Sequence, residues 1–415
     1  MPLKLITLIL QAVLWPAATV AADTTSSIFS FAGFGTVGVV HSSESQADFT
    51  NNRFQANGAG YTRNWSPTVD SLLAGQVTAD FTKRLSAVVQ VIAQQRYDGG
   101  YRPQVEWANI RYEITPDFSV RLGRTALPVF MENDSRRIGY SNPWVRPPGE
   151  VYGLEPVSSS DGVDVSYRMP MGKTINTIQV SAGSTDTKFP GATVIPDGVT
   201  NVRRLIVITD SIERGFVIVH FTYLQARLTV DAIKPLFDAF RLFGPQGEEI
   251  ADEYQLQDHA VTFLSVGANY DPGRWFAMGE WGRFQSHSFV GAANGWYVSV
   301  GYRIGKVTPY GTYASVRPFG NTSDPGLDVT FLPPDLAAQA RALNAGLNAT
   351  LGAAPSQRTI SLGARWDFRR NMDAKLQLDR GYIGAGSPGL LTNLQPGFQT
   401  GGTVDLISAT VDFVF

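Results

Sequence analysis

The sequence predicts an all-β fold, a transmembrane antiparallel β-barrel of about sixteen strands with short periplasmic turns and long extracellular loops. Segments of about ten to fifteen residues alternate apolar and polar side chains, the pattern of strands with one apolar face. The connections between these segments alternate between short and long. The composition is 43% hydrophobic, yet beyond the first twenty residues no apolar run reaches the ~18 residues that a membrane helix needs.

The segment 358–368 illustrates the alternation. Ile360 and Leu362 fall on one face of an extended chain, and Arg365 and Asp367 fall on the other. The alternation is poor in 200–210 and 216–230, which predicts a register break or a face covered by protein there. The expected strands are 28–41, 70–82, 86–98, 104–115, 118–127, 159–168, 174–184, 200–210, 216–230, 259–270, 275–285, 295–305, 308–316, 358–368, 373–382 and 402–415.

The connections place the strand ends on two sides of a membrane. Every connection after an even-numbered strand is tight, whereas most connections after odd-numbered strands are long. An even strand count then puts both ends of the barrel on the tight-turn side, which is the layout of bacterial outer-membrane barrels. Closure is required because lipid offers no partner to an open sheet edge. The long loops are 42–69, 128–158, 185–199, 231–258, 317–357 and 383–401.

The N-terminal residues 1–22 have the pattern of a cleavable signal peptide. Lys4 is followed by an apolar stretch from Leu5 to Trp15, and small residues at Val20 and Ala22 precede Asp23. The remainder, 23–415, is expected to form a single barrel domain.

Composition and motifs exclude several function classes. The net charge of −2 gives no electrostatic footprint for nucleic acid, and the absence of cysteine excludes disulfides and thiolate chemistry. The four histidines show no metal-binding spacing, so no metal or cofactor is expected. We expect no enzyme. An outer-membrane hydrolase is the alternative, with Asp258 beside His259 or His287 between Ser286 and Ser288 as its candidates.

Three segments resemble a known family. The C-terminal strand Ala409–Phe415 is similar to the terminal signature that the barrel-assembly machinery reads, Gln357–Arg380 resembles a porin hairpin, and Phe31–Thr36 resembles a first strand. The chain thus resembles the Gram-negative outer-membrane porins of the general sixteen-stranded class. The resemblance implies a location in the outer membrane, contact with its lipid and lipopolysaccharide, a homotrimer, and a third loop folded into the barrel.

The same resemblance directs attention to the third long loop, 128–158. Unlike the acidic third loops of many porins, this loop mixes both signs of charge. Strand parity adds wall charges that should face the lumen, since a mid-membrane Arg or Lys on the lipid face costs ~2–4 kcal/mol. Arg168, Lys375, Asp80, Asp164 and Asp367 are among these. The expected constriction and pore-lining residues are Glu132, Asp134, Arg136, Arg137, Arg146, Glu150, Arg96, Arg111, Arg121, Arg303, Arg365, Glu113 and Glu280.

The expected function is a water-filled channel for passive diffusion of small hydrophilic solutes across the outer membrane, filtered by size and charge. Two alternatives remain open. One is a substrate-selective porin that uses Tyr140, Trp144 and Tyr152 as a contact surface. The other is an adhesion barrel whose long loops bind a partner. Helices are expected at 235–243 and 334–351 within two of these loops, either packed over the mouth or acting as a gate.

Overall fold

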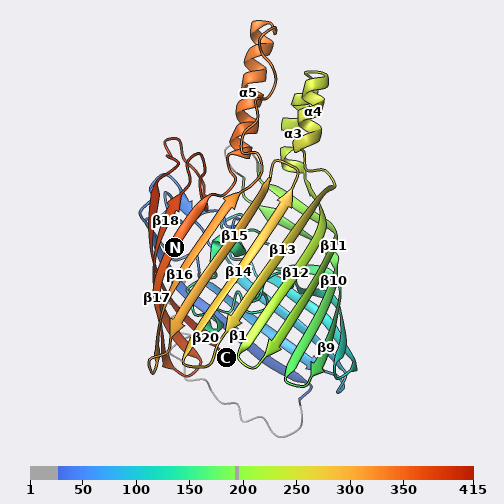
Figure 1. Ribbon diagram of the computed structural model, residues 1–415, viewed down its shortest axis with the longest axis vertical. Coiled ribbons are helices and arrows are strands. Elements are labelled where there is room, and N and C mark those ends of the chain that lie inside the picture. The colour runs from blue at the N-terminus through green and yellow to red at the C-terminus, as the bar shows by residue number, and fades with distance from the viewer. Residues whose placement is uncertain (1–26, 192–195) are drawn as a thin grey trace.

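The computed structural model describes residues 27–191 and 196–415, so the expected signal peptide lies outside the described residues. Sixteen strands form a closed antiparallel barrel in which each strand pairs with its neighbours in chain order (Figure 1). The first and last strands close the barrel, with Phe34 opposite Val414 and Ser42 opposite Leu406. Among the described residues, no helix has the length and apolar character needed to cross a membrane.

Each of the sixteen expected segments corresponds to one barrel strand. The strands are β1 (Phe29–Ser42), β5 (Leu72–Asp80), β6 (Leu85–Gln94), β7 (Gln104–Thr115), β8 (Phe118–Ala126), β9 (Ser159–Met171), β10 (Thr174–Phe189), β11 (Gly198–Arg214), β12 (Val217–Val230), β13 (His259–Tyr270), β14 (Trp275–Ser286), β15 (Ala292–Tyr302), β16 (Val307–Pro318), β17 (Gln357–Arg369), β18 (Met372–Ile383) and β20 (Thr403–Val414).

The poorly alternating segments are β11 and β12, and both of their predicted features are present. The register between them shifts between Arg203 and Ile206, where Arg204 has a positive φ of 50°. Inward-facing Val207 and Leu224 are buried in an apolar cluster with the third loop, which explains why an apolar residue is tolerated on that face.

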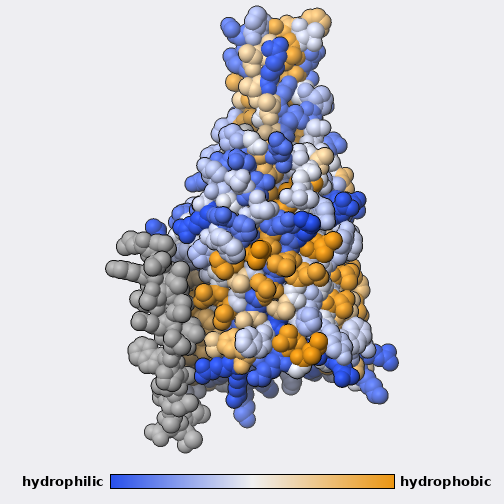
Figure 2. Space-filling view, turned by 90° about the vertical axis from the view of Figure 1, so that its left-hand side faces the viewer, coloured by the Kyte–Doolittle hydropathy of each residue, from blue (hydrophilic) through white to orange (hydrophobic). Residues whose placement is uncertain are grey.

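The outer face of the barrel carries an apolar belt. Exposed side chains such as Leu122, Leu362, Leu376 and Trp366 all point outward from their strands. In the space-filling view, a hydrophobic belt on this side of the barrel is bordered by hydrophilic residues above and below (Figure 2). Such a band is what a lipid-facing surface requires.

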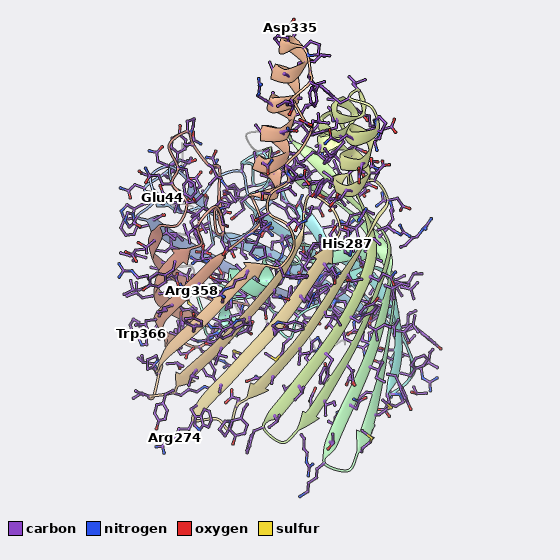
Figure 3. All side chains as sticks on the ribbon, turned by 45° about the horizontal axis from the view of Figure 1, so that its top comes forward. Glu44, Arg274, His287, Asp335, Arg358 and Trp366 are labelled. Atoms are coloured by element: carbon purple, nitrogen blue, oxygen red, sulfur yellow. The ribbon has the colours of Figure 1, made fainter. Side chains whose placement is uncertain are left out.

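Helices rise from the long-loop end as a tower (Figure 1). The tower consists of η2 (Asp231–Ile233), α3 (Lys234–Arg241), α4 (Pro245–Tyr254) and α5 (Pro334–Leu351). Helix α4 was not predicted; it follows Gly244, whose φ of 74° ends α3 and reverses the chain. Buried side chains of all three α-helices, among them Phe240, Ile250 and Leu347, form one core. Asp335 marks the tip of α5, far from Arg274 in a short turn at the opposite end (Figure 3).

Two long loops cover the top of the closing seam. A small sheet joins β2 (Asp48–Phe49) and β3 (Ala59–Gly60) of the first loop with β19 (Leu391–Thr392) of the last loop. The two-residue strand β4 (Trp65–Ser66) pairs with the end of β1. Two further short helices, η1 (Gly139–Ser141) and α2 (Gly149–Tyr152), lie in the third loop.

The closing seam depends on glycines beneath aromatic rings. The backbone of Gly33 exchanges two hydrogen bonds with Phe415, of 2.8 and 2.9 Å. A Cβ added at Gly33 would overlap the ring of Phe415, and one added at Gly35 would overlap that of Phe413. The missing side chains therefore let the last two aromatic residues lie flat against the first strand.

We predict that Gly33→Ala destabilises the barrel by about 1–3 kcal/mol, because the added methyl group displaces the Phe415 ring. The matched control is Gly75→Ala. Gly75 pairs with Gly33 on the adjacent strand, but an added Cβ there has no neighbouring atom within 4 Å. Urea unfolding of the refolded protein should separate the two variants. Equal unfolding midpoints would show that the ring does not need the glycine.

Candidate functional site

The third loop, residues 127–158, enters the lumen and crosses it. Near its start, the Val129 carbonyl accepts the Ser265 hydroxyl at 3.0 Å, and the Met131 amide donates to Glu280 at 3.0 Å. At its apex, Lys375 donates to the Gly139 carbonyl at 2.5 Å. The loop thus spans from the β13–β14 wall to the wall next to the closing seam, as the resemblance implied.

Aromatic packing fixes the middle of the loop. Trp144 is 1% exposed, and its indole nitrogen donates to Ser299 at 2.9 Å and to Thr312 at 3.1 Å. Its ring meets Tyr297 edge to face at 5.6 Å between ring centres. Phe130 packs on Tyr152 in the same cluster, at 4.5 Å. Part of the inner wall is therefore apolar and covered by the loop, in agreement with the protein-covered face that the poor alternation of 200–210 and 216–230 allowed.

A buried ion pair holds the second half of the loop. The Arg146 guanidinium binds both carboxylate oxygens of Asp70, at 2.9 and 2.6 Å, and also donates to Ser408 at 2.8 Å. Asp379 lies 3.6 Å away. Burial alone would lower the pKa of Arg146, but the Asp70 carboxylate outweighs it and the pKa is raised. Arg146 is therefore a tether between three parts of the chain rather than a free pore charge.

Glu150 has a similar structural position. Its carboxylate is buried and accepts the hydroxyl of Thr359. Burial raises the pKa of Glu150, and the Thr359 hydroxyl offsets part of that effect. Glu150 therefore anchors the third loop to β17 and does not face open space.

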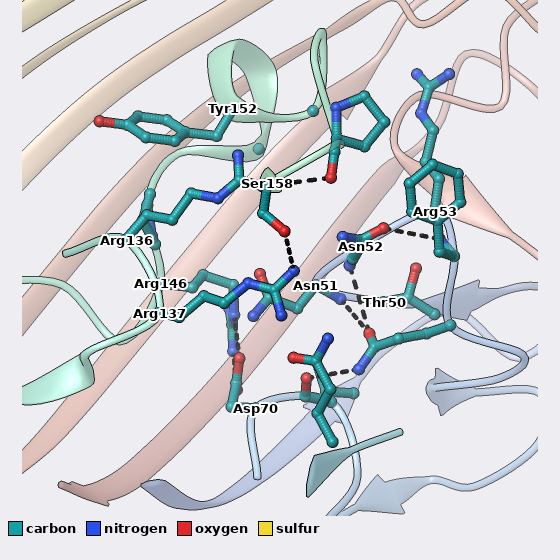
Figure 4. Close-up of a pocket in the computed structure, with 18 of the residues that line it drawn as sticks. Thr50, Asn51, Asn52, Arg53, Asp70, Arg136, Arg137, Arg146, Tyr152 and Ser158 are labelled. Carbon is teal, nitrogen blue, oxygen red and sulfur yellow. Dashed lines mark hydrogen bonds and ion pairs between the residues drawn. The ribbon is translucent and has the colours of Figure 1, made fainter. Parts of the chain in front are cut away.

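Above the loop lies a cavity of about 640 Å³, which we call the vestibule. Its floor is the third loop, and its walls include the first loop and the extracellular ends of several strands. In the close-up, Arg136 and Arg137 lie opposite the first-loop residues Asn51 and Arg53 (Figure 4).

The vestibule contains more basic than acidic side chains. Its basic lining residues are Arg53, Arg96, Arg124, Arg136, Arg137, Arg146 and Lys188, and its acidic ones are Asp70, Glu106, Glu150, Asp186 and Asp379. The carboxylates are engaged: Glu106 with Arg137 at 3.3 Å, for example, and Asp186 with Arg203 at 2.5 Å.

Four of the cations have no such partner. Among the described residues, no carboxylate lies within the 4.0 Å of an ion pair of Arg53, Arg96, Arg136 or Lys188. Arg136 instead donates to two backbone carbonyls of its own loop, at 3.3 and 3.5 Å. The vestibule therefore has uncompensated positive charge.

The expected wall charges lie mostly in local ion pairs. Arg121 pairs with Asp164 at 2.8 Å, Arg111 with Glu113 at 3.1 Å, and Arg303 with Asp271 at 2.6 Å near a short turn. Arg365 pairs with Asp373 at 3.1 Å and donates to the carbonyl of Tyr140. Arg96 was expected on a strand, but β6 ends at Gln94 and Arg96 lies in the following loop.

The remaining expected residues of the loop and wall have other partners. Glu132 accepts the Ser135 hydroxyl at 2.6 Å, and Asp134 is exposed. Glu280 is 3% exposed, and its second carboxylate oxygen has no hydrogen-bond partner among the described residues. Of the expected pore-lining residues, only Arg96, Arg136 and Arg137 both line the vestibule and are partly exposed.

The first loop was missed as part of the site. Its residues 49–55 line the vestibule, and Gln55 holds it in place by donating to the Val69 carbonyl at 2.9 Å. No periodic pattern marks these residues in the sequence. The one available signal was Arg53, a cation in a loop otherwise rich in uncharged polar residues.

The described part of the chain was also searched for metal-binding clusters and for serine–histidine pairs of the kind that hydrolases use. No group of three or more potential metal ligands occurs among residues 27–191 and 196–415. Ser286 bonds to Ser288 at 2.7 Å, and His287 contacts Gln285, so neither serine is activated by that histidine. The Ser211 hydroxyl meets Nδ1 of His220 at 2.7 Å; the other ring nitrogen meets Thr222, so no carboxylate orients this ring.

Comparison with known proteins shows which solved structures have a similar fold. No protein-family model matches the sequence, and no curated protein sequence matches it. Solved structures do. OmpT of Vibrio cholerae in a trimer form aligns with a TM-score of 0.52 at 11% identity, over 93% of this chain and 99% of that one. An anion-selective porin from Comamonas acidovorans gives 0.52 at 12% identity, over 93% and 99%. Salmonella typhi OmpF gives 0.50 at 13% identity, over 93% and 97%.

We predict that Arg146→Met lowers the free energy of unfolding by about 3–5 kcal/mol, because it leaves Asp70 buried without its partner. The control is Arg303→Met, whose partner Asp271 is partly exposed and whose loss should cost about 1 kcal/mol or less. Urea titration measures both, and hydrogen exchange should show faster exchange in 143–158 for Arg146→Met only. Protection of that segment equal to the parent protein's would mean that the ion pair does not hold the loop.

Proposed function

We propose that this chain, which has the fold of the outer-membrane porin class, forms a water-filled channel for passive diffusion of small hydrophilic solutes. The observation that carries the proposal is the third loop, which crosses the inside of a closed barrel and narrows its lumen. Solutes would pass through the vestibule and beside the loop, on the side away from the apolar cluster. A non-enzymatic role agrees with the arrangement of the serines and histidines described above.

The charge of the vestibule supports a preference for anions. Four cations without carboxylate partners line its walls, and low-dielectric surroundings strengthen their field relative to open water. Substrate selectivity through Tyr140, Trp144 and Tyr152 receives less support, because Trp144 and Tyr152 are buried at 1% and 8% exposure against the barrel wall.

The assembly and environment belong to the same proposal. We place the chain in the outer membrane of a Gram-negative bacterium, delivered by the signal peptide 1–22 and inserted by the barrel-assembly machinery. The trimer form of the similar OmpT structure and the exposed apolar belt support a homotrimer surrounded by outer-membrane lipid and lipopolysaccharide.

We predict that Arg136→Glu shifts ion selectivity toward cations by several-fold, since one unit charge about 4 Å from an ion changes its energy by ~1 kcal/mol even in water. The matched control is Arg341→Glu, the same reversal on an exposed residue of α5, where salt screens the charge. Reversal potentials in a planar bilayer under a salt gradient measure both. Equal shifts, or no conductance in the parent protein, would refute the proposed filter or the channel itself.

The tower favours a second candidate function, attachment of a partner at the cell surface. Its segment 231–258 holds seven acidic and two basic residues, a net charge of −5. Phe331 and Leu242 are 92% and 85% exposed, and Phe331 lies four residues before Asp335 at the tip (Figure 3). We take these exposed apolar side chains beside acidic helices as the contact points for a basic partner.

We predict that Phe331→Ser with Leu242→Ser leaves single-channel conductance unchanged and reduces adherence of expressing cells to a surface coated with a cationic protein. The control is Leu336→Ser, a less exposed residue of the same tower at 42%. Adherence unaffected by the double change would exclude the tip as an attachment surface.

A further inference from the structure

Three arginines form a row on the outer face of the barrel, at the extracellular edge of the apolar belt. On β17, Arg358 points to the same side as exposed Ile360 and Leu362, one step closer to the long loops. Strand register extends the row: Arg283 lies opposite Asn294, and Asn294 lies opposite Arg317. Figure 3 shows Arg358 on β17 between the loop end and Trp366.

The row continues to an aromatic residue. Arg358 lies opposite Tyr382 on β18, and on its other side opposite Ser315, two residues before Arg317. A pocket of about 230 Å³ lies at this point, lined by Arg317, Ser356, Gln357, Arg358, Tyr382, Ile383 and Gly384. Its volume is several times the ~30 Å³ that one water molecule occupies in the liquid.

These arginines differ from other arginines near the long-loop ends of the strands. Arg380 pairs with Asp405 at 2.8 Å, Arg124 with Asp161 at 2.6 Å, and Arg203 with Asp186 at 2.5 Å. In contrast, no carboxylate of the described chain lies within 4.0 Å of the side-chain nitrogens of Arg283, Arg317 or Arg358. The row is therefore a local concentration of positive charge without carboxylate partners.

One of the three is also held in place. The Arg283 guanidinium stacks on the ring of Phe319, at 4.0 Å from the ring centre. Planar guanidinium groups bind phosphate through paired N–H donors, and a fixed one loses less freedom when it does so. The apolar belt directly below would contact acyl chains of any lipid whose headgroup lies in the row.

We propose that Arg317, Arg358 and Tyr382, extended by Arg283, bind the phosphate group of a phosphorylated glycolipid in the outer leaflet. The proposal rests on the outer-membrane location proposed above, but it is independent of conduction. A lipid is favoured over a soluble phosphate because Arg358 and Tyr382 face the same side of the sheet as exposed Ile360 and Leu378.

The test uses the full chain refolded into phosphatidylcholine vesicles that contain a small fraction of fluorescent, bis-phosphorylated lipid A. Energy transfer from the protein's tryptophans reports lipid near the barrel. We expect Arg317→Gln with Arg358→Gln to weaken the association by about fivefold for each arginine removed. The matched control, Arg380→Gln with Arg203→Gln, removes two paired arginines from the same edge and should have much less effect.

Further arms separate the explanations. Dephosphorylated lipid should bind the parent protein as weakly as phosphorylated lipid binds the double variant. Equal losses in the variant and the control would overturn the site in favour of general surface charge. Displacement of the lipid by millimolar inorganic phosphate would overturn the choice of a lipid, and a changed oligomeric state of the variant would identify the row as a subunit contact instead. The conductance of the variant should be unchanged, so a failure of the lipid site can be distinguished from a failure of the proposed channel.

Discussion

Backbone hydrogen bonding in a medium without water is the constraint on which the structure depends. In lipid, every strand edge needs a partner, so the sheet must close and the first strand must meet the last. Because β1 and β20 meet antiparallel, the strand number is even and both barrel ends lie on the same side. At this seam, Gly33 and Gly35 leave room for the rings of Phe415 and Phe413.

Closure leaves a wide lumen, and the third loop determines what remains of it. Its aromatic residues pack on the wall from β13 to β16, and its charged residues engage the wall next to the seam. The apolar contacts fill the lumen next to β13–β16, and a cavity remains between the third loop and the first loop. The proposed filter depends on this cavity, because Arg136 and Arg137 line it.

Strand positions were predictable because lipid imposes a period of two on every spanning segment. Where protein covers the inner wall, as at Val207 and Leu224, that period weakens, and the sequence pattern weakened at the same place. The site was less predictable. Strand parity identified Arg121, Arg365 and Glu280 as inward-facing. It did not identify their partners, which are Asp164, Asp373 and the backbone amide of Met131 respectively. Such pairings join distant parts of the chain, and no local pattern encodes them. Asp70 was likewise not predicted as a site residue; only the structure shows that it binds Arg146.

The tether at Arg146 also has a consequence for the order of assembly. Its hydrogen bonds reach Asp70, 76 residues earlier, and Ser408, 262 residues later on the final strand. The binding site for the loop is therefore complete only when β20 is in place beside β1. Local hairpins form readily, whereas contacts of long sequence separation form late in folding. The same arginine therefore makes the position of the third loop depend on the closure of the barrel, so that a change at the seam is also a change inside the lumen.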